Sequence, residues 1–151
     1  MKNFFLFLFL ISSFLFSSLA QQSKIDSLEN VLKTAKDDTN KINILITISY
    51  ELKSVNVSKA IDYANELIIL ARKLNFKSGE ASGLSNLSVA YRYQGNLDKA
   101  LEYALQALKI REEINDQPGI ATSYNNIGLI YHNQGNYDEA MKCYAKTIKI
   151  R

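Results

Sequence analysis

The chain is poor in the residues on which most catalytic and metal sites depend. Its 151 residues include one His, one Cys, one Pro and no Trp. A single cysteine excludes an intrachain disulfide, and a zinc site needs further His or Cys ligands near His132 or Cys143, which the sequence lacks. No Gly-rich phosphate loop is present. We therefore expect no enzyme activity, no metal and no cofactor.

Clusters of like charge are also absent. The chain has 18 basic and 15 acidic residues, which are interspersed, with no run of five or six of one sign. Nucleic-acid-binding proteins usually carry a basic stripe with interleaved aromatic residues. We therefore expect no nucleic-acid partner.

The first 20 residues differ in composition from the rest. They hold six of the seven Phe residues and a single charge, Lys2. Small residues in Ser18-Leu19-Ala20 suit signal peptidase, so we predict a signal peptide over 1–20, cleaved before Gln21. An uncleaved anchor is the alternative, but the apolar run of about 16 residues is shorter than the about 20 that a spanning helix needs. We expect an exported protein of the periplasm or extracytoplasmic face, with no membrane contact beyond this segment.

The remaining sequence repeats itself. A shift of 40 positions places 79–111 on 119–151, with 12 of 33 residues identical. A weaker first copy aligns Asn56 with Asn96. Its first helix is aligned by taking Tyr50 as the counterpart of Tyr91, with one extra residue in the turn. Fixed periods of this kind are typical of stacked repeat folds.

Each copy is predicted to be a pair of antiparallel helices. In the third copy, apolar residues such as Ile127 and Tyr131 recur at helical spacing. Gly135 ends that helix, as Gly95 does in the second copy. Asn136 then caps the next helix, with Glu139 completing a capping box.

Small and aromatic positions recur between the copies. We predict that Ser88 and Gly128 let the two helices of a hairpin approach closely. The contact points on the second helix are Ala60, Ala100 and Ala140. The aromatic residues that fill the wedge toward the neighbouring hairpin are Tyr50, Tyr91 and Tyr131.

This pattern resembles the tetratricopeptide repeat (TPR). The positions that carry the resemblance in the third copy are Tyr124, Ile127, Gly128, Tyr131, Ala140, Tyr144 and Thr147. In the second copy they are Leu84, Leu87, Ser88, Tyr91, Ala100, Ala104 and Ala107, and in the first Asn43, Ile46, Thr47, Tyr50, Ala60, Ala64 and Leu67. The closing Pro of the family is absent, and the period of 40 is similar to that of its longer-helix members, including kinesin light chain. The resemblance implies an all-α, right-handed solenoid of antiparallel helix hairpins that binds proteins or peptides.

The predicted organisation has five parts. Ile25 to Lys36 is expected to form a capping helix with Ser23 as its N-cap. The boundaries are 1–20 for the signal peptide, 21–38 for the capping helix, 39–76 for repeat 1, 77–116 for repeat 2 and 117–151 for a truncated repeat 3.

The resemblance also implies a binding groove lined by the first helix of each repeat. Related proteins present Asn side chains there to a peptide backbone, and Asn86 and Asn126 match that position, whereas Leu45 stands there in the first copy. The other groove candidates are Asn125, Ser85, Arg92, Tyr93, His132 and Asn133. In the alternative interpretation, Asn86 and Asn126 only fix the geometry between repeats.

Two functions follow from this organisation. The first is an exported, non-enzymatic scaffold for protein–protein interaction. The alternative is the N-terminal sensing region of a membrane-bound sensor kinase or transcriptional regulator, because the arrangement resembles the N-terminal TPR regions of such bacterial proteins. The last helix has no evident cap, so we also expect an apolar C-terminal face and self-association through it.

Overall fold

The computed structural model describes residues 20–150. The chain divides into two compact units, and the boundary between them in the sequence follows Thr34. In the first unit, residues 20–32 are helical. The predicted signal peptide, except Ala20, lies outside the described residues. Across 20–150, no helix combines the length and apolar character needed to cross a membrane.

The predicted bounds of the N-terminal helix are wrong. Residues 20–24 are already helical, and Gln22 donates a 2.8 Å hydrogen bond to Asp26 one turn later. Ser23 therefore lies inside the helix and is not its N-cap. The helix ends at 32, before the predicted Lys36, and the hydroxyl of Thr34 donates to the carbonyl of Val31. The capping role of this helix stays a prediction.

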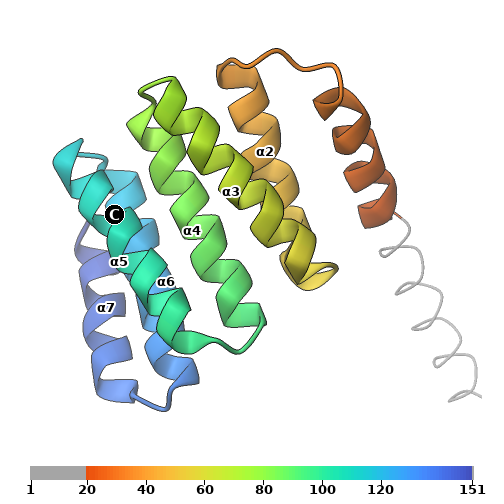
Figure 1. The fold of residues 1–151 in the computed structure, drawn as a ribbon. Helices are drawn as coiled ribbons and strands as arrows, with labels where there is room; N and C mark the ends of the chain where they lie inside the picture. Colours follow the sequence, from red (N-terminus) through yellow and green to blue (C-terminus); the bar gives the residue numbers. More distant parts are fainter. Residues whose placement is uncertain (1–19, 151) are drawn as a thin grey trace, which may run out of the picture. The chain divides into compact units, whose positions relative to one another are not determined.

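The second unit consists of helices joined by short turns (Figure 1). Each helix packs on the next, and α4 also contacts both α2 and α6. The first helices of the three hairpins therefore lie side by side, and the predicted all-α arrangement of antiparallel helix hairpins is confirmed. The elements are α2 (Thr39–Glu51), the 3-10 turn η1 (Leu52–Ser54), α3 (Val57–Lys73), α4 (Lys77–Tyr93), α5 (Leu97–Glu113), α6 (Gln117–Asn133) and α7 (Tyr137–Ile150).

The turns after α3, α4, α5 and α6 share one construction. Each is three residues long, and its middle residue has a positive φ, namely Asn75 (52°), Gly95 (81°), Asn115 (55°) and Gly135 (77°). Gly and Asn tolerate this left-handed conformation best, so the predicted helix stops at Gly95 and Gly135 are confirmed. Such short turns force neighbouring helices to run antiparallel.

Polar side chains begin most of the helices. Asn56 and Asn96 accept hydrogen bonds from the backbone N–H groups of Lys59 and Lys99. These bonds satisfy N–H groups that a helix leaves unpaired at its start. The capping box predicted for α7 differs, because the Glu139 carboxylate accepts a 2.6 Å bond from Lys142.

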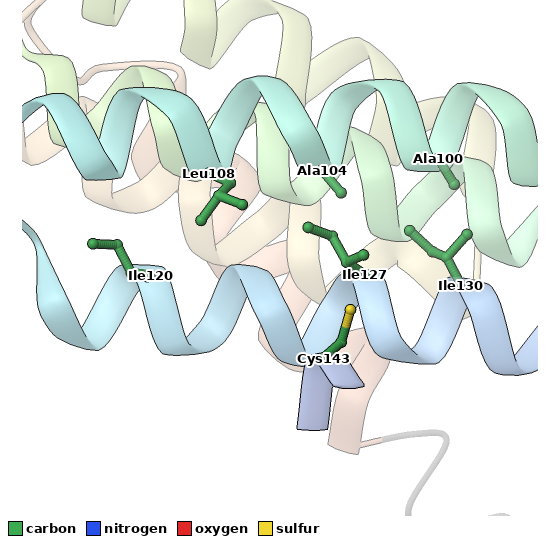
Figure 2. Close-up of a cluster of buried hydrophobic side chains, with 7 residues drawn as sticks. All are labelled: Ala100, Ala104, Leu108, Ile120, Ile127, Ile130 and Cys143. Carbon is green, nitrogen blue, oxygen red and sulfur yellow. The ribbon is translucent and has the colours of Figure 1, made fainter. Parts of the chain in front are cut away.

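The core of the last two repeats lies between α5 and α6. Figure 2 shows residues of α5 facing residues of α6, with Cys143 of α7 on the other side of α6. The buried residues of this cluster are Ala100, Ala104, Leu108, Ile120, Ile127, Ile130 and Cys143. Tyr91 and Tyr131 pack against the cluster, as predicted. Tyr91 also stacks on Tyr103, with ring centroids 5.5 Å apart.

Close approach within each hairpin depends on small residues. The hydroxyl of Ser88 donates a 2.8 Å bond to the carbonyl of Ala100. A Cβ added to Gly128 would lie 2.6 Å from the Tyr144 ring. Ala60 and Ala140 are buried as well. The close approach predicted at Ser88 and Gly128 is therefore confirmed, whereas contact of Ala60 and Ala140 with the first helix stays a prediction.

The predicted register of the first repeat is wrong in its first helix. Tyr50, expected in the wedge, is 49% exposed, and Asn43 is also exposed. The buried residues instead match the second repeat at a shift of 39, namely Leu45 with Leu84, Ile48 with Leu87, Ser49 with Ser88 and Leu52 with Tyr91. The alignment failed because an aliphatic residue, Leu52, fills the aromatic position, and because the turn at η1 is one residue shorter rather than longer.

Candidate binding groove

A hollow of about 420 Å³ lies along the first helices of the three repeats. Side chains of α2, α4 and α6 form its walls, with η1 at one end and the last turn of α5 also reaching it. All of these elements belong to the second unit. All three repeats contribute residues to the hollow.

Equivalent positions of successive repeats line this groove. Ile46, Ser85 and Asn125 form one set of counterparts, and Tyr50, Val89 and Leu129 form the next. Lys53 and Arg92 are counterparts one turn further along. Spacings of four and three residues place these positions on one face of each helix. The repeat therefore builds the groove by presenting the same helix face three times.

Six of the eight groove residues predicted from the sequence come together here. They are Ser85, Asn86, Arg92, Tyr93, Asn125 and Asn126. The other two, His132 and Asn133, do not line the hollow. Both are exposed at the end of α6, where the His132 ring lies edge-on to Tyr137 with centroids 5.3 Å apart.

Asn86 is tied into the packing between repeats. It is 8% exposed, and its side-chain nitrogen donates to the carbonyl of Ile46 (2.9 Å) and to the hydroxyl of Ser49 (2.7 Å). Ser49 in turn donates to the carbonyl of Leu45 at 2.6 Å. Both amide hydrogens of Asn86 are therefore used in holding α4 on α2, as the structural interpretation of this residue expects.

Asn126 has different surroundings from Asn86. It is half-buried, and its side chain makes no hydrogen bond with another residue of the described range 20–150. Ser88, the counterpart of Ser49, donates its hydroxyl to Ala100 instead. The amide of Asn126 thus remains available to a molecule in the groove.

Two cation–aromatic pairs lie on the rim of the groove. The ammonium of Lys53 is 3.3 Å from the Tyr50 ring centroid, and the guanidinium of Arg92 is 5.0 Å from that of Tyr93. Sequence reasoning missed Tyr50 and Lys53 as groove residues because the register of α2 was misassigned. In the corrected register, Lys53 is the counterpart of Arg92 and Tyr50 is the counterpart of Val89, which predicts both residues on the groove.

Arg111 is a third cation on the groove, and it comes from the second helix of its repeat. It is 7% exposed, and its NH1 group donates to the carbonyl of Gly119 (3.1 Å) and the hydroxyl of Ser123 (2.8 Å). Burial lowers the pKa of the Arg111 guanidinium, and the nearby Asp116 carboxylate partly opposes that effect. No pattern within the first helices could have indicated this residue.

Reactive side chains are not gathered elsewhere in the described residues. Cys143 is 8% exposed in the core, and burial raises the pKa of its thiol. A buried thiol of this kind is a poor nucleophile. Within 20–150, no three or more His, Cys, Asp or Glu side chains form a cluster that could hold a metal ion.

Several solved structures have a fold similar to that of this chain. BtubC (BKLC) from P. vanneervenii has a TM-score of 0.74 at 21% identity, over 87% of this chain and 57% of that one. The TPR domain of Arabidopsis FLU has a TM-score of 0.58 at 20% identity, over 87% and 94%. TPR-like repeats of a putative kinesin light chain from Podosopora anserina have a TM-score of 0.68 at 17% identity, over 89% and 68%. At these identities the likeness shows the fold alone.

The sequence comparison agrees with the likeness of fold. The chain spans little more than half of BtubC, and no curated protein matches the chain. Residues 79–151 match the model of the tetratricopeptide repeat, a family whose members are generally non-enzymatic scaffolds for protein–protein interaction. The family match over these residues and the shared fold together support a TPR-repeat protein.

Proposed function

We propose that the chain is a non-enzymatic scaffold that binds an extended peptide segment of another protein in the groove on α2, α4 and α6. The observation that carries this proposal is the hollow of about 420 Å³, to which each repeat contributes the same helix face. Concave surfaces of stacked repeats are the usual binding surfaces of such folds.

The groove offers the groups that an extended peptide requires. The amides of Asn125 and Asn126 can each donate and accept, which suits a peptide backbone whatever its sequence. The rings of Tyr50 and Tyr93 supply amphipathic surface for side chains. Because Asn86 is occupied between helices, we assign backbone contact to Asn125 and Asn126.

We also propose that this binding takes place outside the cytoplasm. The support is the sequence pattern of 1–20, with one charge, an apolar run and small residues before Gln21.

The peptide-binding proposal can be tested without a known partner. A library of random ten-residue peptides displayed on phage would be selected on the immobilised chain, and recovered peptides would be measured by fluorescence polarisation. We expect recovered peptides to bind Asn126→Ala several-fold more weakly than the unaltered chain, because a hydrogen bond is lost. Asn65, exposed on α3 away from the groove, provides the matched control Asn65→Ala. Failure to recover any peptide, or equal binding to both variants, would argue against the proposal.

A further inference from the structure

The charged residues that line the groove are all basic. Lys53, Arg92 and Arg111 line the hollow, and no Asp or Glu does. The whole chain has nearly balanced charge, with 18 basic and 15 acidic residues. The groove therefore differs from the rest of the chain in the sign of its charge.

Arg111 is buried, whereas Lys53 and Arg92 are only half-buried. Its NH1 group is held by two neutral acceptors, Gly119 and Ser123. In the described residues, no carboxylate forms an ion pair with Arg92 or Arg111, whereas Arg72 and Lys77 both pair with Glu80. Desolvation of a buried charge is unfavourable unless a paired charge offsets it, and the nearby Asp116 carboxylate, which forms no ion pair with Arg111, offsets it only in part.

The repeat architecture does not require an arginine at this position. The counterpart of Arg111 in the first repeat is Ala71, which is fully buried. Space for the longer side chain comes from Gly119, where an added Cβ would lie 2.7 Å from Cδ of Arg111. Ser123, which holds the guanidinium, replaces Gly83 of the second repeat. Two positions thus differ together from their counterparts, Arg111 from Ala71 and Ser123 from Gly83, and they place a cation beside the groove.

We infer that the groove binds an acidic peptide, and that an Asp or Glu carboxylate of this peptide pairs with Arg111. This inference rests on the peptide binding proposed above and names the chemistry of the ligand. Arginine has five donor hydrogens in a planar fork, so NH1 can stay bonded to Ser123 while other N–H groups meet a carboxylate. Lys53 and Arg92, at the same position of successive repeats, attract further acidic side chains along the groove.

The phage selection described above tests this inference when the recovered sequences are read. We expect Asp and Glu to be enriched over the input library on the unaltered chain and on Lys109→Gln. That variant removes an exposed charge from the same helix, outside the groove. We expect the enrichment to disappear on Arg111→Gln.

A second measurement separates pairing from a structural effect of Arg111. The most enriched acidic peptide would be synthesised together with a version in which Gln and Asn replace Glu and Asp. We expect Arg111→Gln to weaken the acidic peptide about tenfold, the scale of a charge-assisted hydrogen bond. The amide version should bind both chains equally. Arg92→Gln, at a rim position, should weaken the acidic peptide less and leave helicity unchanged.

The possible failures are distinguishable. Recovered peptides without acidic enrichment would overturn this inference and leave the proposed peptide binding standing. An equal loss of the acidic and amide peptides on Arg111→Gln would show that Arg111 serves only the fold. Recovery of no peptide would overturn the inference and the proposed function together.

Discussion

Asn86 and Asn126 show how one residue type at equivalent positions can have two roles. Asn86 donates to Ile46 and Ser49 and so belongs to the packing between α2 and α4. Asn126 has no such bond in the described residues and lines the groove. Asn86 therefore contributes to the stability of the fold and Asn126 is available for binding, although the two residues occupy equivalent positions of the repeat.

At this scale, Asn86→Ala should destabilise the fold. It leaves the carbonyl of Ile46 and the hydroxyl of Ser49 without their partner, which costs about 1–3 kcal/mol in a buried site. Asn126→Ala should change stability by less than about 0.5 kcal/mol. Urea unfolding followed by circular dichroism measures both, and equal losses would contradict the difference in their surroundings.

A second residue-scale prediction concerns Gly128. A Cβ at this position would lie 2.6 Å from the ring of Tyr144. Gly128→Ala should therefore destabilise the third hairpin by about 1–3 kcal/mol, because overpacking forces the helices apart. The matched control is Ala145→Gly, an exposed change on α7, which should cost about 1 kcal/mol through helix propensity alone. A thermal midpoint for Gly128→Ala above that of the control would contradict this account.

At the scale of the element, sequence reasoning found the helices, their turns and most of the small contact residues. These features follow from local rules, such as Gly at a left-handed turn and a helical spacing of apolar residues. It misplaced α2 because Tyr50 was the nearest aromatic residue, whereas the buried position belongs to Leu52. It also missed Arg111, because a second-helix residue reaches the groove only through the packing of α5 against α6.

The turns give a prediction about backbone conformation. Gly95 has a φ of 81°, and nothing lies within 4 Å of where its Cβ would be. Gly95→Ala should therefore cost about 1–2 kcal/mol through the left-handed conformation alone. Asn115→Gly, at the same turn position with a φ of 55°, should be close to neutral. Differential scanning calorimetry compares the two, and an unchanged midpoint for Gly95→Ala would show that the turn can change its conformation without cost.

At the scale of the whole molecule, the outer face of α7 matches a contact surface used inside the stack. Met141 and Ile148 are 68% and 75% exposed, whereas their counterparts Leu101 and Leu108 pack in the core between α5 and α6. We propose that a second copy of the chain covers this face. The double variant Met141→Glu with Ile148→Glu should be monomeric by light scattering, and the unaltered chain dimeric. A monomeric unaltered chain at high micromolar concentration would contradict this proposal.

The proposed export gives another whole-molecule prediction. Production of the full chain in a bacterial host should place it outside the cytoplasm, with an N-terminus at Gln21 by mass spectrometry. A chain lacking 1–20 should stay in the cytoplasm. Cytoplasmic retention of the full chain would contradict the proposal.

Nuclear magnetic resonance can locate peptide binding on the face shared by α2, α4 and α6. A selected ten-residue peptide would be titrated into the isotope-labelled chain while backbone amide shifts are followed. We expect the largest shifts in 46–53, 85–93 and 122–129, with small changes along the outer face of α3. Shifts concentrated on α3 or α7, with the groove unchanged, would contradict the proposed binding.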